Sequence, residues 1–180
     1  MKSLLKIVAC CILFTPILAT ADVSNYLYIP DMPGDSDLPE VIPSAQKANT
    51  ISIVEYSTGI TNTAKIGSGS SGAGAGKATL TSLTFVKYLN QASGFFFKDC
   101  AQGDVISSAV FTTYKNAGTV ELKEIWQLDL SKGIITSVTL SNDDTGTPTE
   151  VITVTFESVK WKYFPTKVDG TPGTPITGSF

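Results

Sequence analysis

The chain has 180 residues, with 13 basic and 16 acidic side chains and a formal net charge of −3 at pH 7. All the cations are lysines, because the sequence contains neither arginine nor histidine. Without imidazole, the Ser-His-Asp and Cys-His catalytic systems and the usual catalytic zinc site are excluded. Nucleic acid and anionic membranes bind to basic protein surfaces, which a mildly acidic chain does not favour. We therefore expect no nucleic-acid partner.

The first segment, residues 1–21, has the three-part layout of a secretory signal peptide. Two lysines make its start positive, residues 7–18 form a mostly apolar run, and small residues precede a predicted cleavage between Ala21 and Asp22. A membrane-spanning helix needs about 20 apolar residues, so this run is too short to serve as one. The layout predicts a secreted or periplasmic protein with no membrane attachment after cleavage.

The cysteines are consistent with export. Cys10 and Cys11 lie in the predicted signal, so only Cys100 remains and no internal disulfide is expected. The alternative is a lipoprotein signal cut ahead of Cys10, although few apolar residues precede that position. The three phenylalanines before Cys100 favour a buried structural thiol over a reactive one.

The remaining chain is rich in short β-type segments bounded by turn residues. In chain order, strands are expected at residues 26–29, 51–56, 79–89, 105–115, 119–130, 134–141 and 150–164. One helix is expected at residues 93–101, with Ser93 as its cap, Phe96 and Cys100 on one face, and Gly103 at its exit. This pattern predicts an all-β fold, a β-barrel or two-sheet sandwich, with one short α-helix.

Two strands carry a pattern of faces. In residues 119–130, one face is apolar (Val120, Leu122, Trp126, Leu128 and Leu130) and the other polar (Glu121, Lys123, Gln127 and Asp129). In residues 150–164, the apolar positions change parity, from Ile152, Val154 and Phe156 to Val159, Trp161 and Tyr163. A strand cannot exchange its faces without an irregularity, so we expect a β-bulge or sharp bend near Glu157 and Ser158.

Residues 67–76 are glycine- and serine-rich, and they contain both a G-x-G-x-x-G pattern and a Gly-Lys pair. Neither pattern is followed by the strand-to-helix context that holds a phosphate, so we expect a flexible loop and no cofactor.

Two further groups have a functional and a structural interpretation. Asp31, Asp35 and Asp37 alternate as calcium ligands do, but the distal glutamate of a calcium loop is missing, so a solvated turn and no metal are expected. Trp126 and Trp161 could form a ligand platform, but each lies on the apolar side of its strand, which favours the core.

A series of short segments matches a known pattern in order and spacing. They are Gly74-Ala75-Gly76-Lys77, Leu83-Thr84-Phe85-Val86-Lys87-Tyr88, Asn90-Gln91-Ala92-Ser93, Lys98-Asp99-Cys100-Ala101-Gln102-Gly103, Lys115-Asn116-Ala117-Gly118, Leu122-Lys123-Glu124, Ser137-Val138 and Val154-Thr155-Phe156-Glu157-Ser158-Val159, continuing through Tyr163 and Pro165 to Lys167-Val168-Asp169-Gly170. In this series the chain resembles the haemolysin-coregulated protein (Hcp) family of bacterial type VI secretion, over about residues 26–170. The family's histidine after the cysteine is absent, since Asp104-Val105 stands in its place.

The resemblance implies a barrel of two sheets with one flanking helix, and self-association into hexameric rings that stack into an ejected tube. It also implies effector or secretion-apparatus proteins as partners and no catalysis by the chain itself. In the family the equivalent loop is extended and contacts neighbouring subunits or rings, which makes Gly67, Gly69, Gly72, Gly74 and Gly76 candidate contact residues. The expected organisation is a signal peptide at residues 1–21, an Hcp-like domain at 22–170 and a flexible tail at 171–180.

Two other functions remain open. Tube subunits of the family carry no signal peptide, so an exported chain could instead be a monomeric binding module that uses the same barrel outside the inner membrane. An exported hydrolase that uses paired carboxylates is also chemically possible, but no spacing in the sequence singles out such a pair.

Overall fold

The computed structural model describes residues 23–35, 37–64, 76–116, 122–168, 171 and 173–179. The predicted signal peptide, its cleavage site at Ala21 and Asp22, and the loop residues Gly67, Gly69, Gly72 and Gly74 lie outside these ranges.

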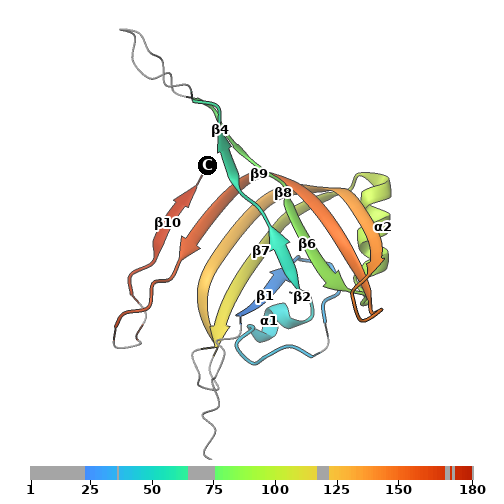
Figure 1. The fold of residues 1–180 in the computed structure, drawn as a ribbon, viewed down its shortest axis with the longest axis horizontal. Helices are drawn as coiled ribbons and strands as arrows, with labels where there is room; N and C mark the ends of the chain where they lie inside the picture. Colours follow the sequence, from blue (N-terminus) through green and yellow to red (C-terminus); the bar gives the residue numbers. More distant parts are fainter. Residues whose placement is uncertain are drawn as a thin grey trace, which may run out of the picture.

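The described chain is dominated by β-strands that curl into a barrel, with α2 at one side (Figure 1). In chain order the elements are β1 (Val23–Tyr28), α1 (Ser44–Lys47), β2 (Thr50–Ile53), β3 (Glu55–Ser57), β4 (Ile60–Asn62), β5 (Ala78–Leu80), β6 (Leu83–Tyr88), α2 (Ser93–Gln102), β7 (Val105–Asn116), β8 (Leu122–Asn142), β9 (Pro148–Tyr163) and β10 (Ile176–Ser179). The all-β fold class with one short helix is confirmed, and α1 is a four-residue turn of helix that the sequence pattern did not indicate.

The sheet closes because β2 and β3, which follow one another in the chain, pair with strands at opposite ends of the sheet. Its strand order is β2-β1-β7-β8-β9-β6-β3, with all neighbours antiparallel. β2 and β3, at the two ends of this order, are consecutive in the chain and separated only by Val54, whose N–H donates to the Val86 carbonyl at 2.8 Å. The pairing therefore returns on itself, and the apolar side chains that face inward form one core.

β8 is a single strand of 21 residues, although the sequence predicted two strands with a break between them. β9 pairs with it along almost its whole length, which extends the pair beyond the barrel (Figure 1). A register shift against β7 makes Ile125 an extra residue, because Thr113 pairs with Trp126 and Tyr114 with Glu124. The predicted common face is therefore wrong for Leu122, which packs instead on the small cluster of Tyr26, Ile42 and Tyr114.

The change of faces predicted in β9 is present. Phe156 and Val159 are buried, and Glu157 and Ser158 between them are both exposed. β8 changes face at the same point, where Lys132 adopts a left-handed φ of 51°. We expected a β-bulge or a sharp bend here. The pairing register is continuous across this point, so the irregularity is a local distortion of both strands and not a register-shifting bulge.

Helix α2 is anchored by aromatic packing. Phe96 is fully buried and meets Phe85 of β6 edge to face at 5.9 Å, while α2 packs against β8. The predicted exit is confirmed, since Gly103 caps the helix at φ 71°. The predicted cap is wrong: Ala92 occupies the N-cap position, and no side chain caps the helix.

Ser93 has another role, in a buried ion pair. Lys87 of β6 and Glu150 of β9 have fully buried side chains, and Nζ and Oε2 lie 2.6 Å apart. The Ser93 hydroxyl accepts from Lys87 Nζ at 3.0 Å and donates to Glu150 Oε2 at 2.9 Å. Two strands and the start of α2 therefore meet in one polar group inside the barrel.

Asn90 extends this group toward the first loop. Its Oδ1 accepts from Lys87 Nζ at 2.8 Å and from the Ala92 N–H at 3.0 Å. Its Nδ2 donates to Asp35, whose other oxygen accepts the Ser52 N–H. These hydrogen bonds attach the turn between β6 and α2 to Lys87 of β6 and, through Asp35, to Ser52 of β2.

Replacing Lys87 alone should destabilise the protein strongly. Lys87→Met leaves the Glu150 carboxylate buried without a cation, and we expect the free energy of unfolding to fall by about 3–5 kcal/mol. The double variant Lys87→Met/Glu150→Leu should regain most of this loss, because an apolar pair of similar volume replaces a buried ion pair at little net cost. Urea denaturation measures both values.

Lys132→Met is the matched control, because it removes a lysine from an exposed ion pair with Glu157. It should leave the unfolding midpoint nearly unchanged. A double variant no more stable than Lys87→Met would contradict the assignment of the loss to an unpaired charge.

Candidate functional site

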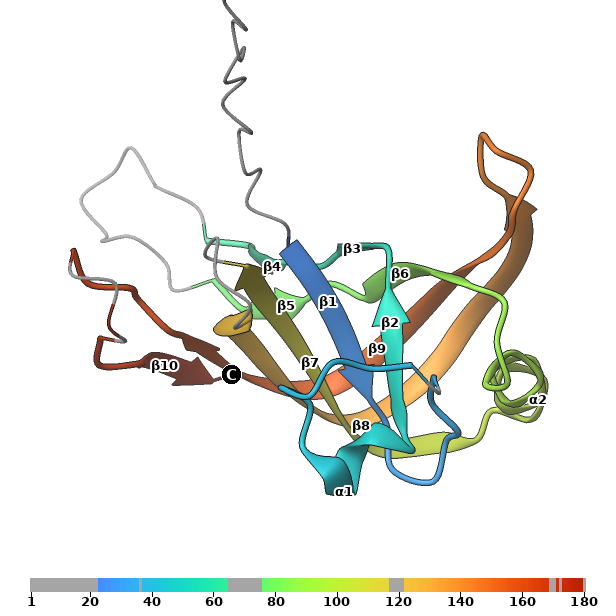
Figure 2. The same ribbon diagram turned by 90° about the horizontal axis from the view of Figure 1, so that it is seen from below.

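The hairpin of β4 and β5 projects from the barrel on the side away from α2 (Figures 1 and 2). Its register pairs Ile60 with Leu80 and Asn62 with Ala78, and it forms a two-stranded sheet of its own. At its base, the Thr81 N–H and hydroxyl both donate to the Gly59 carbonyl at 2.8 Å. The hairpin is therefore an arm held at its base by a few local hydrogen bonds.

Gly76 is the one candidate contact glycine within the described residues. It lies beside the other arm of the hairpin, where a side-chain Cβ would come within 1.9 Å of the Ala64 backbone nitrogen. Its lack of a side chain thus lets the two chain segments approach. This explains the residue structurally and leaves its contact role a prediction.

A cavity of about 340 Å³ opens between the base of the hairpin and the extension of β8 and β9. Its lining is almost wholly apolar: Thr58, Gly59, Ile60, Leu80, Trp126, Leu128, Leu130, Val159 and Trp161. The Trp126 and Trp161 rings stack with centroids 5.7 Å apart and planes within 11°. Both tryptophans are half-buried and pack against the core, so the predicted core role is confirmed in part. Both also line the cavity.

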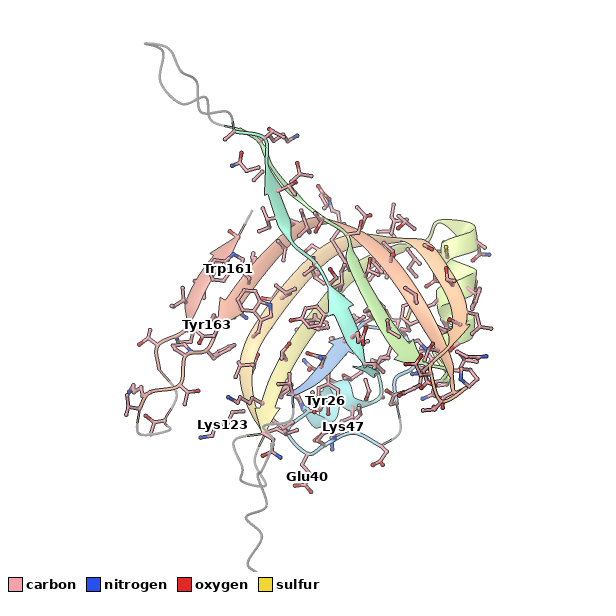
Figure 3. The ribbon with its side chains drawn as sticks, in the orientation of Figure 1. Tyr26, Glu40, Lys47, Lys123, Trp161 and Tyr163 are labelled. Carbon is pink, nitrogen blue, oxygen red and sulfur yellow. The ribbon has the colours of Figure 1, made fainter. Side chains whose placement is uncertain are left out.

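The apolar lining continues across three strands into solvent. The register places Trp126, Tyr163 and Ile176 in one cross-strand row of β8, β9 and β10, and Leu128, Trp161 and Gly178 in the next. We call these residues the tryptophan face. Tyr163 is 43% exposed and Ile176 55% exposed, and Figure 3 shows Trp161 and Tyr163 on β9 beside β10. Apolar surface is thus left uncovered at the end of the sheet that leaves the barrel.

β10 was not foreseen, because residues 171–180 were expected to form a flexible tail. In the structure, Ile176–Ser179 instead pair antiparallel with β9. Gly178 permits this pairing, since a Cβ there would lie 2.5 Å from the Trp161 ring. Within the described chain β10 pairs only with β9, so its outer backbone edge is open.

The opposite side of β8 and β9 is polar. Lys162 Nζ lies 3.1 Å from Asp129, whose other oxygen accepts from Gln127. Burial raises the pKa of Glu124, an effect that Lys162 opposes and Asp129 reinforces. Burial, Glu124 and Tyr26 together raise the pKa of Tyr114 to about 12.

The predicted aspartate turn and thiol have structural surroundings. Both Asp35 oxygens accept hydrogen bonds, from Asn90 and Ser52, while Asp31 adopts a left-handed φ of 64°. Among the described residues, no group of three His, Cys, Asp or Glu side chains is placed to hold a metal ion. Cys100 is partly buried against the core, so the prediction of a buried structural thiol is confirmed only in part.

Comparison with known proteins decides the family. Residues 26–163 match the family described as "Type VI secretion system effector, Hcp". The chain belongs to this Hcp family. Proteins of the family oligomerise into rings and tubes, and they are structural tube or secreted proteins. No curated protein sequence matches the chain significantly.

Solved Hcp structures share the fold. A type six secretion system protein superimposes with a TM-score of 0.75 at 21% identity, covering 88% of this chain and 93% of the other. Hcp1 from Salmonella typhimurium gives 0.65 at 25% identity, with coverage of 88% and 93%. A type VI secretion system effector from Yersinia pestis gives 0.63 at 17% identity, with coverage of 87% and 98%. The chain is thus a type VI secretion Hcp-like protein.

Neither helix of the described residues has the length and apolarity to cross a bilayer.

Neutralising Glu124 should stabilise the protein in a pH-dependent way. A carboxyl whose pKa is higher in the folded chain binds its proton more tightly there, so its ionised form disfavours folding as the pH rises above the unfolded value of about 4.3. Glu124→Gln should therefore raise the free energy of unfolding at pH 8, and this gain should disappear below pH ~4. Urea denaturation at both pH values measures it, with exposed Glu40→Gln as the charge-matched control. An equal gain at both pH values would refute the explanation.

Proposed function

We propose that this protein is a ring-forming Hcp subunit that acts in type VI secretion through assembly, without catalysis of its own. The observation that carries the proposal is the tryptophan face, an apolar surface on three strands that continues past the barrel. Burial of apolar area is the main driving force for stable association between subunits. Tyr163 and Ile176 are the side chains of this face that a second copy would remove from water.

Two neighbouring features support self-association at this end. The outer edge of β10 offers unpaired backbone donors and acceptors to a neighbouring chain. The hairpin of β4 and β5 projects from the barrel as an arm (Figure 1). We place the glycine-rich loop of Gly67, Gly69, Gly72, Gly74 and Gly76 in the same contact, as the family resemblance implies.

The proposed assembly is a hexameric ring, also from the family resemblance. Such rings stack into a tube whose partners are effector or secretion-apparatus proteins. The formal net charge of −3 at pH 7 disfavours nucleic acid in that role.

The proposed route of export is a cleaved signal peptide at residues 1–21, which makes the protein secreted or periplasmic. Removal of the signal takes two lysines and no acidic residue, so the remaining chain is more acidic. A processed chain would assemble outside the inner membrane and not in the cytoplasm.

The second candidate is a monomeric binding module outside the cell. The cavity of about 340 Å³ favours it, because pockets for small apolar ligands are of this size and are lined by aromatic side chains. The oligomeric state separates the two functions, since a module of this kind needs no second copy.

Ile176→Asp should break the ring without unfolding the subunit. A carboxylate on the tryptophan face would have to be desolvated in the contact, while in the monomer it stays in water. We expect wild type to elute as a ring in size exclusion with light scattering, and Ile176→Asp as a monomer with an unchanged circular dichroism spectrum.

Val105→Asp is the matched control, because Val105 is 61% exposed but lies beside α2. It should assemble like wild type. A strictly monomeric wild type at high concentration would refute ring formation and favour the binding module.

Processing of the export signal can be tested directly. N-terminal sequencing of the native protein from periplasm and medium should find a start at Asp22. An intact Met1 in the cytoplasm would show instead that the protein enters the secretion machine unprocessed. A lipid-modified start at Cys10 would establish the lipoprotein alternative.

A further inference from the structure

Lys87, Asn90 and Glu150 bring an amine, a carboxamide and a carboxyl group together inside the barrel. We propose that the Lys87 side-chain nitrogen and the Asn90 side-chain carbonyl carbon become joined by an intramolecular amide bond, with Glu150 as proton carrier. The protein would thus carry a self-formed isopeptide crosslink between the end of β6 and the turn before α2.

The nucleophile is suitably placed and desolvated. Lys87 is fully buried, and its Nζ lies 2.8 Å from Asn90 Oδ1 and 5.6 Å from the centre of the Phe96 ring. Burial lowers the pKa of Lys87 more strongly than Glu150 and Asp35 raise it. Since only the neutral amine has a lone pair to attack with, these surroundings favour the reactive form.

The electrophile is polarised. Asn90 Oδ1 accepts the Ala92 N–H at 3.0 Å, a backbone donor aimed at the oxygen on which negative charge develops during attack. Asn90 Nδ2 donates to Asp35 at 2.5 Å, which fixes the plane of the carboxamide. The reacting groups are three residues apart, and the hydrogen bond to Oδ1 holds Nζ beside the carboxamide, so attack needs a local turn of the two side chains and no movement of the backbone elements.

Glu150 has a free position for a proton. Its Oε2 accepts from Lys87 and Ser93, whereas its Oε1 is buried without a hydrogen-bond partner in the described structure. A buried carboxylate oxygen left unpaired is costly, so this oxygen is a place where a transferred proton can bind. Glu150 can therefore take up the proton that the Lys87 ammonium must lose before its nitrogen can attack.

The step balances without any other reagent. Glu150 first takes and keeps one proton of the Lys87 ammonium, which frees the lone pair on Nζ. This lone pair forms a C–N bond to the Asn90 carbonyl carbon, a second Nζ proton passes by way of Glu150 to Nδ2, and the bond to Nδ2 breaks. An amine and a carboxamide give a secondary amide and one molecule of ammonia, with no change of oxidation state. In the product, the remaining Nζ–H can still donate to Glu150, and the buried charges are gone.

The test is mass spectrometry of the purified full chain. We expect an intact denatured mass lower than that of its own sequence, from the observed N-terminus, by one ammonia molecule. Trypsin cannot cut after an acylated lysine, so residues 78–98 should appear as one peptide that lacks ammonia and remains uncut at Lys87. An unmodified mass with normal cleavage after Lys87 would overturn the proposal.

Two related products are distinguished by the same peptide. A succinimide at Asn90 also lacks ammonia, but trypsin would then cut after Lys87. An amide between Lys87 and Glu150 would release water instead of ammonia and would link two distant peptides. Either result would overturn the crosslink proposed here.

Variants assign the roles. Asn90→Ser should restore both the unmodified mass and the cleavage after Lys87, and a folded Glu150→Gln should lose the crosslink although Lys87 and Asn90 remain. Lys132→Met, which alters an exposed lysine, should keep the loss of ammonia. A folded Glu150→Gln that still forms the bond would refute the role of Glu150. If this variant does not fold, the wild-type peptide decides the proposal alone.

Discussion

The contact between Lys87 and Glu150 is the constraint on which the arrangement of the barrel depends. A buried charge is tolerated only when it is paired and hydrogen-bonded, so each partner restricts the position of the other. Ser93 and Asn90 complete the group and bring in the start of α2 and the loop that carries Asp35. The pair therefore specifies how β6, β9 and the helix meet, which apolar packing alone would leave less well defined.

Closure of the barrel then determines where the protein can interact. β2 pairs with β1 and β3 pairs with β6, so the strands at the two ends of the sheet have their backbone groups in hydrogen bonds. The described barrel strands therefore leave few open edges. The exceptions are the hairpin of β4 and β5, and β10 on the extension of β9. Both lie on the side away from α2, next to the tryptophan face (Figure 2). Apolar surface and open backbone edges are thus concentrated at one end of the molecule.

Local patterns predicted much of the fold because alternation and turn residues are short-range properties. The alternation identified most strands, and Gly103 marked the end of α2. The same rules failed where a contact with a residue far away in the sequence determines the local structure. A serine can cap a helix, but the Ser93 hydroxyl instead donates to Glu150 of β9. Leu122 lies on the other face because Ile125 is an extra residue in β8. Nothing in the local sequence marks Ile125 as extra, so the change of face was not predicted. β10 depends on a glycine that fits against Trp161, which only the register reveals.

One sequence feature could have revealed the buried site. In β6, Leu83, Phe85 and Lys87 share the inward parity, so a lysine at that position demands a buried anion. The consequence of a crosslink there would be local. Closing so short a loop stabilises by about 2 kcal/mol in the chain-entropy picture, less than a long disulfide loop would. Its larger effect would be to remove two charges from the interior and to fix the turn that leads into α2. Unlike a disulfide, the proposed link could not be opened by a reductant.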